Sequence, residues 1–435
     1  MKNIYILQLI KRSFWSRQIG QIQEGGWRAV QHKIKIVIIR AVYLPVDLFA
    51  YILAVPAVLF VWLIRPLVWI RFGSVRSDVI GPSVFDPEYY LCEREIKNIR
   101  SVDCFYFESK KPPNDQWALM VQRHLRIHPI FRYPDKVCLL FSNGEAHHKI
   151  LCTTGSRDIE GYLSRTKPHI TFSTVENNKG RLFLKELGIK PLNHRFVCLM
   201  VRDSAYKEKY QNLRNRDWSY HDYRNSDIDT YKTAALALAA KGYWVFRMGK
   251  AVNKPFKVFH PQIIDYANSE FRSDFLDIWL MANCDFTIST STGLDDVSII
   301  FRKPILFVNH LPVGDCRTGS NDYTEYFKIL QWEKNGEYLS LRDQINCGAI
   351  RFLNKSDYDR LGIKIIDNTS TQIKNAVLDF EKNLASKDNQ NGNSLLQKKF
   401  WEIMKEYKDF SRYHGKYRAK ISRVFLEEHH EWFLK

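Results

Sequence analysis

This 435-residue sequence lacks closely paired cysteines and zinc-finger spacings, and it has fewer acidic than basic residues. Its eight cysteines are scattered, and no two of them form a C-x-x-C pair. Several lie in apolar runs such as Val137–Leu140 and Val197–Met200. We therefore expect buried, reduced thiols in a reducing compartment, which argues against a disulfide framework and against a cysteine-based metal site.

The shortage of acidic residues leaves a net charge of +18, from 65 Lys and Arg against 47 Asp and Glu. Residues 1–76 carry eleven of the basic side chains against only Glu24 and Asp47, and a second basic run covers 398–423. Basic surfaces attract nucleic acid, anionic lipid or anionic metabolites. Zinc-finger spacing, an RNA-binding aromatic signature and a long basic heptad helix are all missing, so nucleic acid is not an expected partner.

One long apolar run, residues 41–64, contains a single charge, Asp47. The run is long enough to cross a bilayer and begins too late for a cleaved signal peptide. Pro45, Pro56 and Pro66 are expected to break it into short pieces. The positive-inside rule, applied to the basic tail before the run, would export the cysteine-containing body. An in-plane or re-entrant segment at the cytoplasmic face of the inner membrane needs no unbroken helix across the bilayer, and it leaves the cysteine-containing body in the cytoplasm. A single span and a buried core hairpin are the alternatives.

The remaining sequence predicts a mixed α/β fold. In its first half, apolar runs predict strands at Val102–Phe107, Lys136–Phe141 and His169–Phe172, and helices at Asn114–Leu125 and Lys179–Leu187. Composition and pattern divide the chain into a basic tail with the membrane-associated segment (1–76), a first α/β domain on the acceptor side (77–190), a second α/β domain (191–387) and basic C-terminal helices (388–435).

Strands and helices alternate in the second α/β domain. Strands are predicted at Arg195–Val201, Tyr243–Phe246, Gln262–Tyr266, Asp285–Ser289 and Pro304–Asn309, with helices at Asp227–Ala240, Asp274–Asn283 and Leu294–Phe301. Alternation of helices with wholly apolar strands indicates a parallel sheet that is covered on both faces. Ligands of such sheets bind outside the carboxyl ends of the strands.

A run of small polar residues, Ser289 to Gly293, falls at such a strand end. The turn is expected to offer free backbone N–H groups and a helix N-terminus to an anion, and Gly293 to let a phosphate approach the backbone. Capping of the helix is the alternative explanation. Arg202 and Arg247, at neighbouring strand ends, favour phosphate binding.

Five stretches of the sequence carry a resemblance to a known family. They are WIRFGSVRSDVIG, FVCLMVRDSAYKEKY, YHDYRNSDIDTYKTAALALAAKGYWVFRMG, IIDYANSEFRSDFLDIWLMANCDFTISTSTG and FRKPILFVN. Over about residues 69–330 the chain resembles a bacterial family of poorly characterised glycosyltransferases. More distantly, residues 285–309 are similar to the C-terminal half of GT-B glycosyltransferases, where a Ser/Thr-Gly turn meets the diphosphate of the donor.

The resemblance implies two Rossmann-like domains of GT-B type after an N-terminal membrane-associated helical segment. It also implies a nucleotide-sugar as substrate, no cofactor, and a glycan or lipid-linked acceptor at an anionic membrane surface. Arginine forks suit the diphosphate, and the loop after Asp265 is where GT-B proteins commonly hold the nucleoside. The expected donor-binding residues are Arg202, Ser204, Arg224, Arg247, Gly249, Asp265, Tyr266, Glu270, Arg272, Ser289, Thr290, Ser291, Thr292 and Gly293.

Inverting sugar transfer also needs a general base near the acceptor hydroxyl. The candidates are Asp203, His221 and Asp222, with a loop containing Glu145, His147 and His148 as the alternative. Asp227 and Asp229 start a helix and need no metal to explain them, so metal-independent chemistry is expected. Transfer of a non-sugar group such as pyruvyl, or a non-catalytic scaffold in polysaccharide assembly, are the competing functions.

Overall fold

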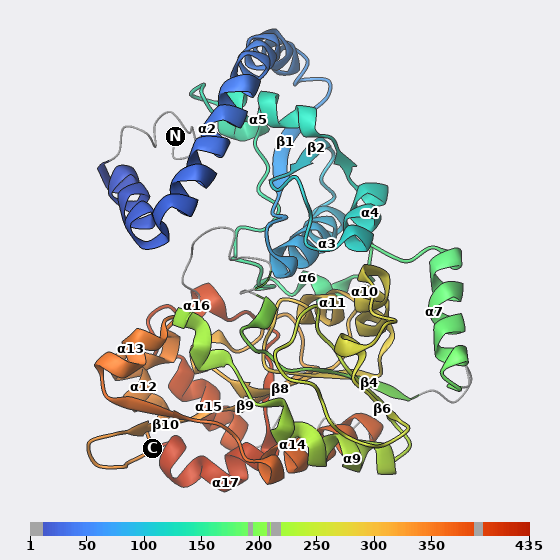
Figure 1. The fold of residues 1–435 in the computed structure, drawn as a ribbon, viewed down its shortest axis with the longest axis vertical. Coiled ribbons are helices and arrows are strands. Elements are labelled where there is room, and N and C mark those ends of the chain that lie inside the picture. The colour runs from blue at the N-terminus through green and yellow to red at the C-terminus, as the bar shows by residue number, and fades with distance from the viewer. Residues whose placement is uncertain (1–11, 190–194, 207–208, 210–218, 387–394) are drawn as a thin grey trace.

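The computed structural model describes residues 12–189, 195–206, 209, 219–386 and 395–435 (Figure 1). They form a mixed α/β fold with parallel sheets of three and seven strands and one antiparallel pair. The N-terminal part contains α2 (Arg12–Leu63), β1 (Ile70–Val75), α3 (Ile80–Ile96), β2 (Val102–Phe107), α4 (Asp115–His124), β3 (Arg126–Ile127), α5 (Arg132–Cys138), α6 (Tyr162–Arg165) and α7 (Thr174–Glu186).

The C-terminal part begins at the first strand of the larger sheet. Its strands are β4 (Phe196–Met200), β5 (Trp244–Arg247), β6 (Ile263–Ile264), β7 (Phe286–Ser289), β8 (Ile305–His310), β9 (Tyr323–Phe327), β10 (Ile329–Trp332), β11 (Ile363–Ile366) and β12 (Lys420–Ile421). Its α-helices are α9 (Lys232–Ala240), α10 (Asp274–Asn283), α11 (Asp295–Ile300), α12 (Leu341–Cys347), α13 (Lys355–Arg360), α14 (Ser370–Ser386), α15 (Leu395–Met404), α16 (Phe410–Tyr413) and α17 (Arg423–Phe433).

The larger sheet is parallel throughout, in the order β12-β9-β8-β7-β4-β5-β6. Counted from β4, the first six strands lie in the order 3-2-1-4-5-6, which is that of a doubly wound nucleotide-binding sheet. The chain reverses direction across the sheet between β4 and β7. Ligands of such sheets bind at that switch point, which here places a site beside the Ser/Thr run after β7.

The C-terminal tail belongs to the same body as the larger sheet. Strand β12 pairs with β9 at the edge of the sheet. Phe400, Phe425 and Phe433 are buried with Phe327 in one aromatic cluster. The aromatic residues of the predicted basic helices therefore serve to attach the tail to the sheet.

The smaller sheet orders its parallel strands β1-β2-β3 and begins at Ile70, ahead of the predicted domain start at residue 77. Its strand Val102–Phe107 is confirmed, but the strand predicted at Lys136–Phe141 is wrong, since α5 occupies its first half and turns follow. A short apolar run suits either element, and here Val137 and Cys138 bury one face of a helix. The strand predicted at His169–Phe172 is also wrong, because the carboxylate of Glu88 accepts the N–H groups of His169 and Ile170.

Helix α2 passes through Pro45 and Pro56, so the prediction that these prolines break the segment is wrong. A proline removes one helical hydrogen bond, and the helix continues on the remaining ones. The kink lies at Gly26 (φ 54°, ψ −147°), and the helix ends three residues before Pro66. Within it, Leu44–Leu63 is long and apolar enough to cross a membrane by length and composition.

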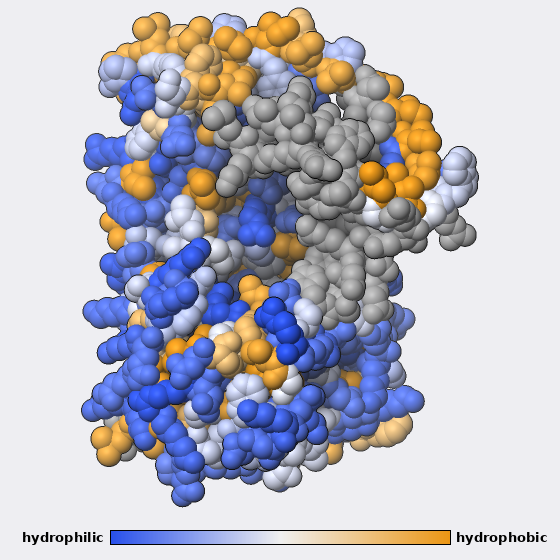
Figure 2. All heavy atoms as spheres, turned by 90° about the vertical axis from the view of Figure 1, so that its left-hand side faces the viewer, coloured by the Kyte–Doolittle hydropathy of each residue, from blue (hydrophilic) through white to orange (hydrophobic). Residues whose placement is uncertain are grey.

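One face of α2 packs against α5 near the smaller sheet (Figure 1). Ala54, Val58 and Val61 are buried there. Asp47, the single charge of the apolar run, accepts a hydrogen bond of 2.6 Å from the Tyr133 hydroxyl. The remaining faces are exposed, and Figure 2 shows apolar atoms gathered at this end of the molecule.

The N-terminal part contacts the larger sheet through α3 and α4, which pack on α11 and α10. An apolar cluster continues across this contact, from Val84 and Trp117 to Ile278 and Val297. A Cβ on Gly293 would lie 2.9 Å from Cγ2 of Ile80 and 3.0 Å from the backbone nitrogen of Gly81. Glycine at 293 therefore allows the backbones of the two parts to meet.

Gly293→Ala is expected to lower the free energy of unfolding by about 1–3 kcal/mol, the usual cost of overpacking. The added methyl group meets backbone atoms of Gly81, which cannot rotate away. Urea unfolding measures the change. Gly20→Ala is the matched control, because a Cβ there meets nothing within 4 Å. Equal stability of the two variants would contradict the contact.

Candidate active site

A cavity of about 850 Å³ lies at the carboxyl ends of β4 and β7, and the N-terminal part also contributes to its walls. Its lining is strongly cationic. Four aspartates, Asp203, Asp277, Asp296 and Asp315, face eight basic side chains: Arg76, Arg157, Arg202, Arg224, Lys250, Arg317, Arg351 and Arg412. This excess of positive charge matches an anionic ligand.

The Ser/Thr run forms the turn between β7 and α11, at the edge of the cavity. Ser291 has φ of 62°, a conformation that non-glycine residues rarely adopt. The backbone N–H groups expected to be free are in use: that of Thr290 donates to the Met200 carbonyl, that of Ser291 to Ser289, and that of Thr292 to Asp295. Hydroxyls and neighbouring arginines, rather than a row of open N–H groups, therefore face a ligand here.

Two arginines meet at Ser291. Arg224 donates to its carbonyl and lies 3.3 Å from its Oγ, and Arg317 donates to the same Oγ at 3.2 Å. The Nε atoms of both arginines have no hydrogen-bond partner among the described residues. Arg202 lies beside them, its backbone N–H donating to Thr290 Oγ1 at 2.8 Å. Several guanidinium groups thus converge on one side of the cavity.

A second group of cations surrounds Asp315 in the loop after β8. Arg157 and Arg351 each donate to its Oδ1 at 2.8 Å. Burial alone would raise the pKa of Asp315, but Arg157, Arg351 and Arg317 outweigh it and hold the pKa below its usual value. Arg351 also lies over the ring of Tyr413, 3.8 Å from its centre. Since one carboxylate faces several guanidinium groups, this wall keeps net positive charge.

Of the expected donor-binding residues, Arg202, Arg224, Thr292 and Gly293 line the cavity, and Ser291 contacts the arginines that do. Ser289 and Thr290 lie behind them, buried, as acceptors within the turn. The Cβ position of Gly293 is filled by Ile80 and Gly81, so this glycine serves the contact between the two parts of the chain.

Arg247 lies outside the cavity in an ion network of its own. Its guanidinium pairs with Asp265 at 3.2 Å, and it is 1% exposed. Asp265 also accepts the Phe256 N–H, and the backbone of Gly249 nearby lies against Val252. Asp203 also lies 3.9 Å from this guanidinium, so two carboxylates compensate the charge of Arg247.

The other expected donor-binding residues are also outside the cavity lining. Tyr266 is buried, and its hydroxyl lies 2.9 Å from Asp277, which also pairs with Arg272 at 2.6 Å. Ser204 accepts a hydrogen bond from Asn253, and Glu270 is exposed. Asp277 itself does reach the cavity, and burial raises its pKa to about 6.

The three candidate bases differ in position. Asp203 lines the cavity, but its carboxylate accepts the N–H groups of Ala205 and Asn253. Asp222 is exposed and accepts from Asn225. The side chain of His221 lies outside the described part of the structure. The alternative loop is remote from the lining, with His147 at the Ile70 carbonyl and His148 paired with Asp135.

Two acidic residues at the start of α11 were not identified from the sequence. Asp295, the first residue of α11, accepts a hydrogen bond of 2.5 Å from the Thr292 N–H and so holds the preceding turn. Asp296 lines the cavity, and burial raises its pKa to about 7, with Arg317 opposing and Asp295 and Asp86 adding to the shift. The signal was present as two consecutive carboxylates directly after the Ser/Thr run.

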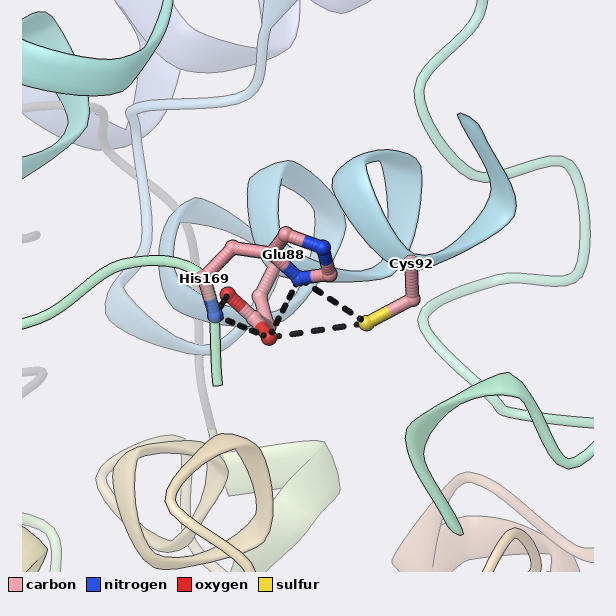
Figure 3. Close-up of side chains that lie close together, drawn as sticks. All are labelled: Glu88, Cys92 and His169. Atoms are coloured by element: carbon pink, nitrogen blue, oxygen red, sulfur yellow. Dashed lines mark hydrogen bonds and ion pairs between the residues drawn. The ribbon is translucent and has the colours of Figure 1, made fainter. Parts of the chain in front are cut away.

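Glu88, Cys92 and His169 form the one group of described residues with the chemistry and spacing of metal ligands (Figure 3). Hydrogen bonds with Cys92 and Glu88 raise the pKa of His169 to about 10, so the imidazole is protonated at neutral pH. Arg302 donates to Glu88 at 3.0 Å and to Cys92 Sγ at 3.3 Å. In this protonation state, His169, Glu88 and Arg302 form an ion network that joins α3 to the C-terminal part.

No protein-family model and no curated protein matches the sequence. Among solved structures, the chain is similar to ADP-heptose LPS heptosyltransferase II of E. coli (TM-score 0.31, 12% identity, 55% of this chain and 84% of that one). It is also similar to a family 9 glycosyl transferase of Veillonella parvula (TM-score 0.41, 10% identity, 74% of this chain and 99% of that one). A third similar structure is that of a Listeria monocytogenes protein assigned as a UDP-N-acetylglucosamine 2-epimerase (TM-score 0.26, 10% identity, 74% of this chain and 98% of that one).

Proposed function

We propose that this protein is a glycosyltransferase that moves a sugar from a nucleotide-sugar to a surface polysaccharide, lipopolysaccharide or lipid-linked glycan. The observation that carries the proposal is the arginine-lined cavity at the switch point of a doubly wound sheet. Nucleotides bind at this position of such sheets, and guanidinium groups suit a diphosphate. The sequence resemblance to glycosyltransferases supports the choice of reaction.

In this proposal, the reacting groups lie between the C-terminal and N-terminal parts in an arrangement of GT-B type. Arg202, Arg224 and Arg317 neutralise the diphosphate as it leaves, so no metal ion is needed for that charge. The N-terminal part, through Arg76 and the loop containing Arg157, lines the acceptor side. Asp227 and Asp229, which have the spacing of a D-x-D motif, are both paired with Lys254.

The membrane is the proposed place of action. The exposed apolar faces of α2 and the excess of basic residues in 1–76 favour an anionic bilayer surface, here the cytoplasmic face of the inner membrane. Because α5 covers one face of α2, a vertical span would draw Arg132 and Lys136 into the hydrocarbon. An in-plane helix avoids this cost.

Calorimetric titration with UDP, GDP, CDP, dTDP and CMP tests the proposal. We expect one preferred nucleotide, bound equally with and without Mg²⁺, and release of that nucleotide from the matching nucleotide-sugar. Arg224→Ala should weaken binding about 10- to 100-fold, the effect of losing a charge-assisted hydrogen bond. Arg342→Ala is the control, since its exposed side chain pairs with Glu406 away from the cavity. A folded protein that binds none of the five nucleotides would refute the proposal.

A further inference from the structure

Asp296 differs from the other acidic groups of the cavity in having a buried oxygen without a hydrogen-bond partner among the described residues. It is 5% exposed, it lines the cavity, and the oxygen without a partner is its Oδ1. Asp203, Asp277 and Asp315 are each held by hydrogen bonds or ion pairs. A buried carboxylate oxygen without a donor is costly unless it is used, so Asp296 is the carboxylate of the cavity that needs an explanation.

The surroundings of Asp296 come from three elements. Arg317, from the loop after β8, lies on one side and favours its charge, whereas Asp295 of α11 and Asp86 of α3 oppose it. A Cβ on Gly81 would lie 2.7 Å from Oδ2, so the start of α3 closes the remaining side. Asp296 therefore sits where the N-terminal part, the Ser/Thr turn and the arginines meet.

We propose that Asp296 is the general base of the transfer reaction. The inference rests on the proposed function. Asp296 accepts the proton of an acceptor hydroxyl while that oxygen forms a bond to the anomeric carbon of the donor sugar. The bond from the anomeric carbon to the diphosphate breaks, and its electron pair leaves with the nucleotide, whose charge Arg224 and Arg317 neutralise. Attack and departure occur on opposite sides, so the configuration of the sugar is inverted.

The acid–base properties of Asp296 fit this role. A base acts best when its pKa lies close to the working pH, and burial raises the pKa of Asp296 to about 7. By contrast, the pKa of Asp315 is held low by three arginines, which leaves it a weak base.

A first experiment needs no substrate. Because the folded-state pKa of Asp296 lies above its unfolded value near 4, its charge costs stability that grows as pH rises from about 4 to about 7. Asp296→Asn mimics the protonated side chain. We expect its melting temperature to match wild type at pH 4.5 and to exceed it by several degrees at pH 8. A variant that is less stable than wild type at pH 8 would show that the carboxylate is structural and overturn the inference.

The second experiment measures release of nucleoside diphosphate from the nucleotide-sugar that the calorimetric panel selects. In wild type, kcat/KM should rise as pH passes through about 7, because the base must lose its proton. Asp296→Asn should lower kcat at least 100-fold and remove this pH dependence, while nucleotide affinity stays within about threefold. Asp359→Asn, an exposed residue paired with Lys355, is the control and should change neither quantity.

The outcomes distinguish a failure of the inference about Asp296 from a failure of the proposed glycosyltransferase function. If Asp296→Asn binds nucleotide and keeps the wild-type pH profile of kcat/KM, Asp296 is not the general base, and the glycosyltransferase proposal stands. If wild type binds no nucleotide, both fail together. Product analysis adds a third outcome, because retention of the anomeric configuration would exclude a single displacement with Asp296 as its base.

Discussion

Replacing Arg317 with methionine is expected to lower the free energy of unfolding by about 3 kcal/mol at pH 7.5 and to abolish nucleotide binding. The guanidinium of Arg317 is the nearest strong counter-charge of Asp296, and Asp315 and Asp295 also raise its pKa against the lowering effect of burial. Removing one partner leaves buried carboxylates uncompensated, which costs 3–5 kcal/mol in buried pairs. We take the lower end because Arg317 is partly exposed. Methionine keeps most of the side-chain volume.

The loss should depend on pH in a definite direction. Without Arg317, the folded-state pKa of Asp296 rises further above its unfolded value, so the penalty grows as pH rises. It should be largest above pH 7 and small at pH 5, where Asp296 is already protonated. Urea unfolding at both pH values measures the difference. Arg342→Met, at an exposed ion pair, should cost less than about 1 kcal/mol at either pH. Similar losses for both variants would contradict the charge cluster.

The larger sheet was predictable because its signals are local. Asp274–Asn283 was predicted as a helix and is α10 with the same bounds, since Ser273 caps it and its apolar residues are buried. Apolar strands such as Phe286–Ser289 lie between turn residues, and their burial on both faces leaves no competing interpretation.

The N-terminal part was less predictable because its side chains are used across long sequence distances. The run at Lys136–Phe141 has one face to bury, and only the presence of α2, some 80 residues earlier, makes it a helix. Glu88 likewise takes the backbone N–H groups of His169 and Ile170, which removes them from any strand. Neither contact leaves a periodic pattern in the sequence.

The residues of the site also divide into those that local sequence features predict and those that depend on long-range contacts. Arg202 and the Ser/Thr run follow predicted strands, and Arg202 and Thr292 line the cavity as topology predicts. Arg224 also lines the cavity, but it precedes a predicted helix. Arg247 does not line the cavity, because a charge at a buried strand end can be satisfied by a nearby carboxylate, here Asp265. Arg157 and Asp315 form an ion pair across 158 positions of the sequence, so no local feature marks them.

The final prediction concerns the exposed surface of α2. Changing Leu48, Phe49, Ile52 and Phe60 to serine is expected to reduce binding to vesicles of phosphatidylethanolamine and phosphatidylglycerol by at least 100-fold. Each of these side chains is more than half exposed. Transfer of such a side chain into the acyl region contributes about 1 kcal/mol or more, so four of them contribute about 4 kcal/mol. The free energy of unfolding should change little, because all four side chains are largely exposed in the folded protein.

The control variant carries serine at Val175, Leu182, Phe259 and Leu395, which are also more than half exposed but lie far from α2 in the sequence. It should sediment with vesicles as wild type does. Wild-type binding should also weaken in 0.5 M salt and on purely zwitterionic vesicles, since basic residues near the helix contribute attraction that salt screens. Equal losses for both variants would mean that general surface apolarity, and not α2, causes binding.

Protection from protease shows whether α2 lies in the plane of the membrane or spans it. With protein bound to the outside of sealed vesicles, an in-plane α2 leaves both residues 12–40 and the body cleavable. A true span would protect one of the two. Contacts of α2 with the body favour the first outcome: the Asp47–Tyr133 hydrogen bond and the Tyr51–Tyr133 ring pair hold the helix along α5. In that arrangement Ile130, Leu140 and Phe141 extend the apolar surface beyond α2, and Arg65 and Lys136 lie at headgroup level.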